Sequence, residues 1–190
     1  HVLIPRPDTE ALVECALDKL PAGRALRLLD LGTGSGAIAL ALAKERPLAN
    51  VIAVDKHAEA LAVAQQNSDR NSITNVEFRQ SDWFDQIDGR FHLIASNPPY
   101  VAPGDPHLNQ GDLRFEPSTA LSAPNHGLAD LETIIQTAPE YLHADGWLLV
   151  EHGFEQADNV SELFLHNGFS DIQLQRDLNG LPRCTAGKLK

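Results

Sequence analysis

The segment Asp30–Gly36, which reads DLGTGSG, decides the fold because it joins two different hydrophobic patterns. The apolar run Leu26–Leu31 is typical of a buried strand, and Ala37–Arg46 has helical spacing and stops before Pro47. Glycines between a strand and a helix allow tight backbone dihedrals and let a ligand approach without meeting a Cβ. The segment therefore predicts a strand, a glycine-rich turn and a helix.

Strand-like and helical segments alternate on both sides of this turn. The expected strands are Val51–Val54, Val76–Arg79, Phe91–Ala95 and Trp147–Val150, and the expected helices lie over Leu12–Leu20, Ala58–Arg70, Leu128–Ile135 and Val160–Phe164. Asp8 and Thr9 are candidate caps of the first helix, and Pro139 is expected to kink the third of these helices. The alternation predicts an α/β fold with a doubly wound, mostly parallel sheet.

The C-terminal segment predicts an antiparallel hairpin. Asp171–Gln175 and Arg183–Leu189 have strand patterns and flank the turn signal Asn179-Gly180. With the five strands upstream, this hairpin makes a seven-stranded sheet. The stretch Val101–Asn125 is longer than most connections, and loops of that length are usually functional or disordered.

The composition is that of one globular domain. The chain has 190 residues, of which 43% are hydrophobic and 22% charged, and this is enough for a substantial core. No apolar run approaches the ~20 residues that cross a bilayer, so we expect no membrane association. Cys15 and Cys184 have no metal-like spacing, which favours reduced thiols in a cytoplasmic protein. The net charge of −11 argues against direct nucleic-acid binding through phosphate neutralisation.

The segment Asn97-Pro98-Pro99-Tyr100 follows the expected strand Phe91–Ala95. Prolines fix φ and keep the preceding residue extended, so the Asn97 amide and its neighbouring carbonyls are held in one geometry. These acceptors could bind the two hydrogens of a planar NH2 group, with Tyr100 as an aromatic wall. Prolines in a tight loop can also form no more than a turn. These four residues alone leave both interpretations open.

The glycine-rich turn has a candidate partner at the end of the second strand. Asp55 lies 19 residues past Gly36, where an acidic side chain can accept hydrogen bonds from ribose hydroxyls. The G-x-G-x-G spacing differs from the G-x-G-x-x-G that seats a pyrophosphate, which favours a nucleoside cofactor without one. A glycine triplet alone is weak evidence, because a tight turn can need glycines for packing.

Ser81-Asp82-Trp83 follows the third strand. Trp83 could cover an adenine face and Asp82 could accept from its amino group, although an Asp-Trp at a strand end is more often a turn with a packed aromatic. Ligands of open α/β sheets bind beyond the carboxyl ends of the strands. The four strand ends carry the glycines, Asp55, Asp82-Trp83 and Asn97, and together they predict a nucleoside cofactor site with a reaction centre at the fourth strand.

With these segments, the chain resembles the class I S-adenosylmethionine-dependent methyltransferases over nearly all of its 190 residues. Asp30–Gly36 is similar to their glycine-rich motif, Asp55 to their ribose-binding acid, and Asn97–Tyr100 to the motif of amino-group methylases. The resemblance implies S-adenosylmethionine as cofactor and S-adenosylhomocysteine as product. The expected cofactor-binding residues are Gly32, Thr33, Gly34, Ser35, Gly36, Asp55, Asp82, Trp83 and Asn97.

Two flanking segments narrow the resemblance. Leu3–Glu10 (LIPRPDTE) and Arg114–Pro117 (RFEP) are similar to those of the HemK-type peptide chain release factor glutamine methyltransferases. The resemblance implies methyl transfer to the side-chain amide of the glutamine in the Gly-Gly-Gln motif of class 1 release factors, which would be the protein partners. The implied catalytic residues are Asn97, Pro98, Pro99 and Tyr100.

The same resemblance bears on domain organisation. The family carries a small helical domain before the segment that resembles Leu3–Glu10, and no such domain is expected within residues 1–190. The chain contains no Met and begins with His1, so its first residue is not a natural translation start. We expect residues 1–190 to be the catalytic domain.

Other interpretations stay open. A methyltransferase for adenine amino groups of DNA or RNA would share the Asn97–Tyr100 chemistry, but would be expected to bring a basic recognition surface. A non-catalytic cofactor-binding module with this fold is an alternative of another class, and a dehydrogenase suits the glycine spacing less. Arg6 is expected to pair with a carboxylate, either that of the cofactor or that of an acidic side chain in a surface salt bridge. Glu116 is expected to line the glutamine pocket or to cap the residues after it. His107, His126 and His152 lack ligand spacing, so we expect no metal.

Overall fold

The computed structural model describes residues 7–101, 124–177 and 179–190, and they form a seven-stranded sheet in the order β3-β2-β1-β4-β5-β7-β6. The strands are β1 (Arg27–Leu31), β2 (Asn50–Asp55), β3 (Val76–Gln80), β4 (Phe91–Ser96), β5 (Leu142–Glu151), β6 (Phe169–Arg176) and β7 (Pro182–Leu189). The first five strands pair in parallel, whereas β7 pairs antiparallel with β5 and β6. The predicted α/β fold, with its doubly wound, mostly parallel sheet and C-terminal hairpin, is confirmed.

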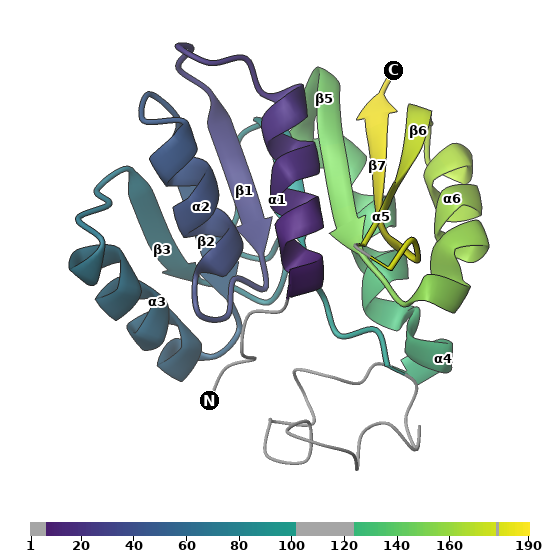
Figure 1. Ribbon diagram of the computed structural model, residues 1–190, viewed down its shortest axis with the longest axis horizontal. Helices are drawn as coiled ribbons and strands as arrows, with labels where there is room; N and C mark the ends of the chain where they lie inside the picture. Colours follow the sequence, from purple (N-terminus) through teal and green to yellow (C-terminus); the bar gives the residue numbers. More distant parts are fainter. Residues whose placement is uncertain (1–6, 102–123, 178) are drawn as a thin grey trace.

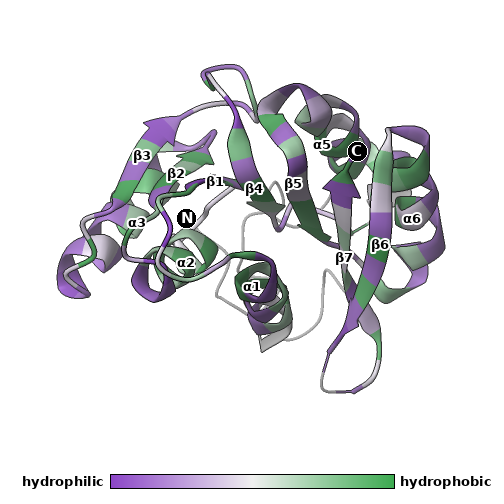
Figure 2. Ribbon diagram, turned by 90° about the horizontal axis from the view of Figure 1, so that it is seen from above, coloured by the Kyte–Doolittle hydropathy of each residue, from purple (hydrophilic) through white to green (hydrophobic). Residues whose placement is uncertain are grey.

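Helices cover both faces of this sheet (Figures 1 and 2). They are α1 (Pro7–Lys19), α2 (Ala37–Glu45), α3 (Ala58–Arg70), α4 (Pro124–Gly127), α5 (Ala129–Tyr141) and α6 (Ala157–His166), with a 3-10 turn η4 (Phe154–Gln156) before α6. Helices α1, α2 and α3 lie on one face, and α5 and α6 lie on the other. In the described part of the chain, no helix is both long and apolar enough to span a bilayer.

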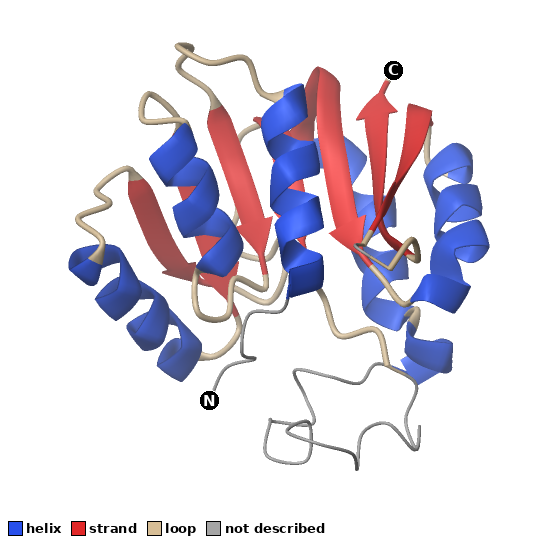
Figure 3. Cartoon of the chain, in the orientation of Figure 1, coloured by secondary structure: helices blue, strands red, loops and turns tan. Residues whose placement is uncertain are grey.

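The parallel strands all end at one edge of the sheet. Leu31 of β1 pairs with Val54 of β2 on one side and with Ser96 of β4 on the other. The arrowheads in Figure 3 therefore point to a common edge, and that of β7 points the opposite way. The segments that follow the parallel strands meet at this edge, which is where the sequence places the candidate site.

Two apolar layers hold the sheet between its helices. Leu12 and Ala16 of α1 pack with Leu42 of α2 on one face, and Ile134 of α5 packs with Phe164 of α6 on the other. All five of these side chains are fully buried or nearly so. In Figure 2 the central strands carry hydrophobic residues, and helices cover them on both faces.

Two local predictions need correction, and a third concerns Pro139. Helix α1 begins at Pro7, so Asp8 and Thr9 lie inside its first turn and do not precede it as caps. Strand β5 begins at Leu142, directly after α5 and well before the predicted Trp147. Pro139 lies inside α5, and the helix ends two residues later at Tyr141. Proline lacks an N–H, so Pro139 removes the hydrogen bond that this position would donate four residues back, and the kink that it predicts stays a prediction.

Gly187 of β7 tests the packing of the hairpin against α6. A Cβ at this position would lie 2.3 Å from the Phe164 ring, and no positive φ complicates the change. We expect Gly187→Ala to lower the free energy of unfolding by about 1–3 kcal/mol through overpacking. In a Phe164→Leu background the same change should cost less, because the ring that it meets is gone. Urea denaturation of the four proteins measures this difference, and equal costs in both backgrounds would contradict it.

Candidate active site

The turn between β1 and α2 contains three glycines that adopt positive φ angles. These angles are +70° at Gly32, +56° at Gly34 and +85° at Gly36, a region that other residues enter with strain. Gly36 is buried, and a Cβ there would lie 3.1 Å from Ala64 of α3. Nothing lies within 4 Å of a Cβ at Gly34. Gly36 thus permits α2 and α3 to pack closely, whereas at Gly34 the turn leaves space that a ligand could occupy.

The buried carboxyl group of Asp30 stabilises this turn from the protein interior through hydrogen bonds. Its Oδ2 accepts hydrogen bonds from the Thr33 hydroxyl (2.6 Å) and from the backbone N–H of Ala39 (3.1 Å). Its Oδ1 is buried and has no hydrogen-bond partner among the described residues. Burial raises the pKa of Asp30 to about 7. The Thr33 side chain faces inward to Asp30, so it stabilises the turn from the interior.

Asp55 lies against the same turn. The sequence pattern predicts this, because it assigns Asp55 and the glycine-rich turn to one cofactor site. It ends β2, and its carboxyl oxygens accept from the backbone N–H groups of Gly34 and His57, each at 2.9 Å. An ionised carboxylate has about four lone-pair positions, so it can accept two further hydrogen bonds. The structure therefore brings Asp55 and Gly34 together and leaves acceptor capacity beside the open part of the turn.

Asp82 and Trp83 follow β3 and differ in their surroundings. The Trp83 ring packs against the turn, 3.3 Å from where a Cβ of Gly32 would lie, and its side chain hydrogen-bonds Asp130 of α5. Burial raises the pKa of Asp130, and the hydrogen bond from Trp83 partly offsets this effect. Asp82 is exposed and forms an ion pair with Lys56. Trp83 thus borders the glycine-rich turn, whereas Asp82 lies at its outer rim.

Asn97 follows β4 at the same edge. The preceding Ser96 hydroxyl is buried and donates to the backbone carbonyl of Leu31 at 2.8 Å, which ties the ends of β4 and β1 together. The Asn97 side-chain Nδ2 donates to the hydroxyl of Thr9 on α1, at 3.2 Å. Asn97 is therefore held by the first helix of the chain as well as by its own strand.

Tyr100 is held at both ends. Its hydroxyl donates to Oε1 of Glu151 at 3.1 Å, and its backbone carbonyl accepts from Nε2 of Gln156 at 3.0 Å. A Cβ at Gly127 would lie 2.0 Å from the same carbonyl, so only glycine fits there. Glu151 is 1% exposed, and its Oε2 accepts from the Thr9 hydroxyl at 2.9 Å. The segment from Asn97 to Tyr100 is thus anchored by α1, β5 and η4.

Several of these anchors are absent from the sequence-based predictions. They are Thr9, which the sequence pattern favours as a helix cap, and Ser96, Asp130, Glu151 and Gln156. Glu151 carries a usable signal, because it is the first acidic residue after the apolar run Trp147–Val150. The rule that singles out Asp55, applied to the fifth strand, would have identified it.

Some predicted residues cannot be placed at the site. Arg6, His107, Glu116 and the first half of the segment Leu3–Glu10 lie outside the described residues, as do Arg114–Pro117 and the side chain of His126. His152 is buried beside Glu151; its Nδ1 lies 2.9 Å from the Gly153 carbonyl oxygen and its Nε2 2.8 Å from the Thr185 hydroxyl. Burial lowers the pKa of His152. No cluster of three potential metal ligands occurs within the described ranges.

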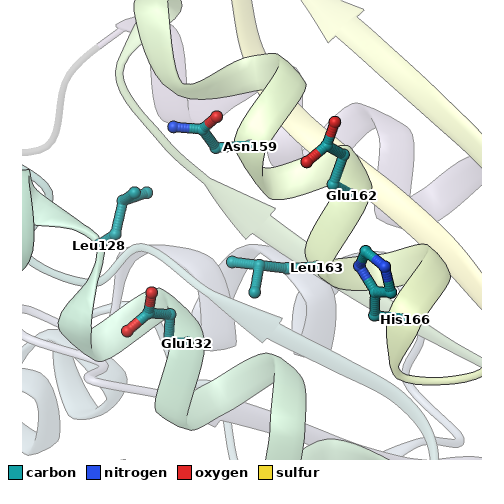
Figure 4. Close-up of a pocket in the computed structure, with 6 residues that line it drawn as sticks. All are labelled: Leu128, Glu132, Asn159, Glu162, Leu163 and His166. Atoms are coloured by element: carbon teal, nitrogen blue, oxygen red, sulfur yellow. The ribbon is translucent and has the colours of Figure 1, made fainter.

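A pocket of about 210 Å³ lies between α5 and α6 (Figure 4). It is lined by Leu128, Glu132, Asn159, Glu162, Leu163 and His166. None of the sequence-predicted site residues contributes to it. The candidate active site is therefore the edge where the parallel strands end, and this pocket is a separate feature.

Comparisons with known proteins point to methyltransferases. A family model described as the methyltransferase small domain matches residues 8–113. The release factor glutamine methyltransferase of Yersinia pestis is 54% identical over 186 residues, which cover 98% of this chain and 67% of that protein. The chain spans about two thirds of the length of the curated relatives it matches.

Solved structures agree with this assignment. The protein-(glutamine-N5) methyltransferase (release factor-specific) from Alicyclobacillus acidocaldarius has a TM-score of 0.61 and 29% identity, covering 98% of this chain and 94% of that chain. A 16S rRNA methyltransferase from T. Thermophilus, solved in complex with AdoMet and guanosine, has a TM-score of 0.68 and 19% identity. It covers 99% of this chain and 44% of that one, and at that identity the likeness shows the fold alone.

The Asp30 carboxyl group should make stability depend on pH. Between pH 3.8, the ordinary pKa of an aspartate, and about pH 7, the folded protein holds a proton on Asp30 that the unfolded chain has lost. The free energy of unfolding should therefore fall as pH rises through this window, by up to about 1.4 kcal/mol per pH unit, and level off above it. Asp30→Asn should remove this part of the slope.

Urea denaturation from pH 5 to pH 8 measures this slope in the wild type and in Asp30→Asn. Asp85→Asn is the matched control, because it makes the same chemical change at an exposed position in the described structure. If wild-type and Asp30→Asn stabilities run parallel over this range, the raised pKa of Asp30 is wrong.

Proposed function

The chain belongs to the release factor glutamine methyltransferase family, and on that premise we propose which reaction its site performs. It transfers a methyl group from S-adenosylmethionine to the side-chain amide nitrogen of a glutamine in a protein. The substrate is the glutamine in the Gly-Gly-Gln motif of class 1 peptide chain release factors. The observation that carries this proposal is the position of Asn97–Tyr100 at the end of β4, beside the glycine-rich turn and Asp55.

The residues of the first three strand ends fit S-adenosylmethionine. The turn is open at Gly34, and Asp55 beside it retains acceptor capacity that suits ribose hydroxyls. The Oδ1 atom of Asp30 is buried below the turn without a hydrogen-bond partner among the described residues. The proposed cofactor-binding residues are Gly32, Thr33, Gly34, Ser35, Gly36, Asp55, Asp82, Trp83 and Asn97. When bound, this cofactor supplies an electrophilic methyl group.

Asn97 is proposed to bind the substrate amide. A glutamine amide nitrogen is a weak nucleophile, because its lone pair is delocalised into the carbonyl group. The Asn97 Oδ1 and the Pro98 backbone carbonyl accept the two amide hydrogens, which orients the nitrogen and favours its pyramidal form. Positioning of this kind supplies up to about 7–11 kcal/mol in the best cases. The same acceptors stabilise positive charge as it develops on the nitrogen.

Pro98, Pro99 and Tyr100 complete the proposed catalytic segment. The two prolines restrict the backbone, so the Pro98 carbonyl keeps one direction. The Tyr100 ring packs on the planar amide of the substrate glutamine. Its hydroxyl and its backbone carbonyl are each held by a hydrogen bond, to Glu151 and from Gln156, so the ring has a defined position before substrate binds.

Replacement of Asn97 tests this assignment. Asn97→Ala should lower kcat for release-factor methylation by at least about 100-fold, because one of the two acceptors is lost. Cofactor binding, measured by calorimetry, should be mostly retained. Asn71→Ala, at an exposed asparagine after α3, is the control and should keep wild-type activity. Near-normal methylation by Asn97→Ala would refute the proposed role.

The substrate is tested with labelled cofactor, the full-length protein and purified class 1 release factors. Label should enter the wild-type factor and not a factor whose Gly-Gly-Gln glutamine is replaced. Equal labelling of both factors would exclude this glutamine as the acceptor. Labelling of oligonucleotides, with none of any release factor, would favour an adenine methyltransferase instead.

A further inference from the structure

The buried side chain of Glu151 contacts the proposed catalytic segment Asn97–Tyr100 on its interior side. Glu151 is the last residue of β5 and is 1% exposed. It accepts hydrogen bonds from two hydroxyl groups, those of Thr9 (2.9 Å) and Tyr100 (3.1 Å). Thr9 in turn accepts from the Asn97 amide at 3.2 Å. A single carboxylate is thus connected to both side chains that are proposed to contact the substrate glutamine.

The direction of these hydrogen bonds follows from chemistry. The Thr9 hydroxyl donates its single proton to Oε2 of Glu151, which accepts it. The Thr9 oxygen then has only lone pairs left to offer Asn97. The Asn97 amide must therefore present its NH2 group to Thr9. If the amide were flipped, two acceptor oxygens would face each other.

This direction fixes the atom that faces the substrate. When Nδ2 of Asn97 is engaged by Thr9, Oδ1 occupies the other branch of the planar amide and remains the acceptor of the side chain. An acceptor is what a substrate NH2 group needs, whereas an NH2 group in its place would repel it. Glu151 also holds the Tyr100 hydroxyl, so it sets the position of the ring as well.

We propose that Thr9 and Glu151 are positioning residues that orient the Asn97 amide and the Tyr100 ring for the substrate glutamine. The proposal rests on the proposed function, because it concerns the same site. Neither residue contacts the substrate, and both act through Asn97 or Tyr100. Helix α1 is in this way part of the active site, although Thr9 lies 88 residues from Asn97 in sequence.

Three variants of the full-length protein test this role. Thr9→Val keeps the shape but removes the hydroxyl, so kcat for release-factor methylation should fall about 10- to 100-fold, with cofactor affinity and thermal midpoint near wild type. Thr9→Ser restores the hydroxyl and should recover most of kcat. Thr133→Val makes the same change at an exposed position of α5 and should keep wild-type kcat.

Glu151→Gln gives a second, independent measurement. Its amide keeps the size of the side chain but can accept well from only one of the two hydroxyls, because its NH2 group faces the other. Its kcat should fall more than its affinity for cofactor. A Thr9→Val enzyme with wild-type kcat, or a Thr9→Ser enzyme as slow as Thr9→Val, would overturn the proposal.

The Asn97 side-chain amide can be followed without any assay of activity. In protein with 15N-labelled asparagine, the NH2 resonances of Asn97 are assigned from their loss in Asn97→Ala. They should move, and their exchange with water should accelerate, in Thr9→Val but not in Thr9→Ser. If they do so while the wild type methylates no release factor, the proposed function fails and the orientation of Asn97 stands. Unchanged resonances in Thr9→Val would overturn the orientation itself.

Discussion

The register of the parallel strands is the constraint on which the site depends. Leu31 pairs with Val54 and with Ser96, so the residues that follow them leave the sheet at one edge. These residues are Gly32, Asp55 and Asn97, each from a different strand. Because strand side chains alternate between faces, a slip of one residue would turn Asp55 or Asn97 to the opposite side. Burial of both faces of the sheet opposes such a slip, so the hydrophobic core specifies the geometry of the polar edge.

That edge contains polar groups that would each destabilise the fold if they were buried alone. An unsatisfied buried polar group costs about 1–3 kcal/mol, and more if it is charged. The hydroxyl groups of Thr9 and Ser96 and the carboxylate of Glu151 avoid this cost by bonding to one another or to the backbone. Asp30 differs, because one of its oxygens is unpaired and its pKa is raised to about 7. The site thus combines a hydrogen-bonded polar network next to Asn97 with an incompletely hydrogen-bonded carboxyl group next to the glycine-rich turn.

Local patterns in the sequence predicted most of the fold and only part of this edge. The alternating strands and helices, the glycine turn and the Asn97–Tyr100 segment are each encoded by neighbouring residues, and so is the position of Asp55. The hydrogen bond from Thr9 to Glu151 joins residues 142 positions apart, and no periodicity reports such a pair. The sequence pattern favours Thr9 as a cap, because threonine is common at helix starts, but the residue lies inside the first turn of α1. The apolar run Trp147–Val150 predicts only the second half of β5, because His143, Ala144 and Asp145 in its first half are exposed.

Helix α1 links the hydrophobic core to the direction of a single hydrogen bond. Leu12 and Ala16 are fully buried against the sheet, and they lie on the same helix face as Thr9, three and seven residues before them. Packing that buries these two side chains therefore also aims Thr9 at Glu151. Because Thr9 determines which end of the Asn97 amide faces the site, the orientation of that amide is set by apolar contacts that never touch it. Close packing in the core can in this way restrict the motion of polar side chains at the edge of the sheet.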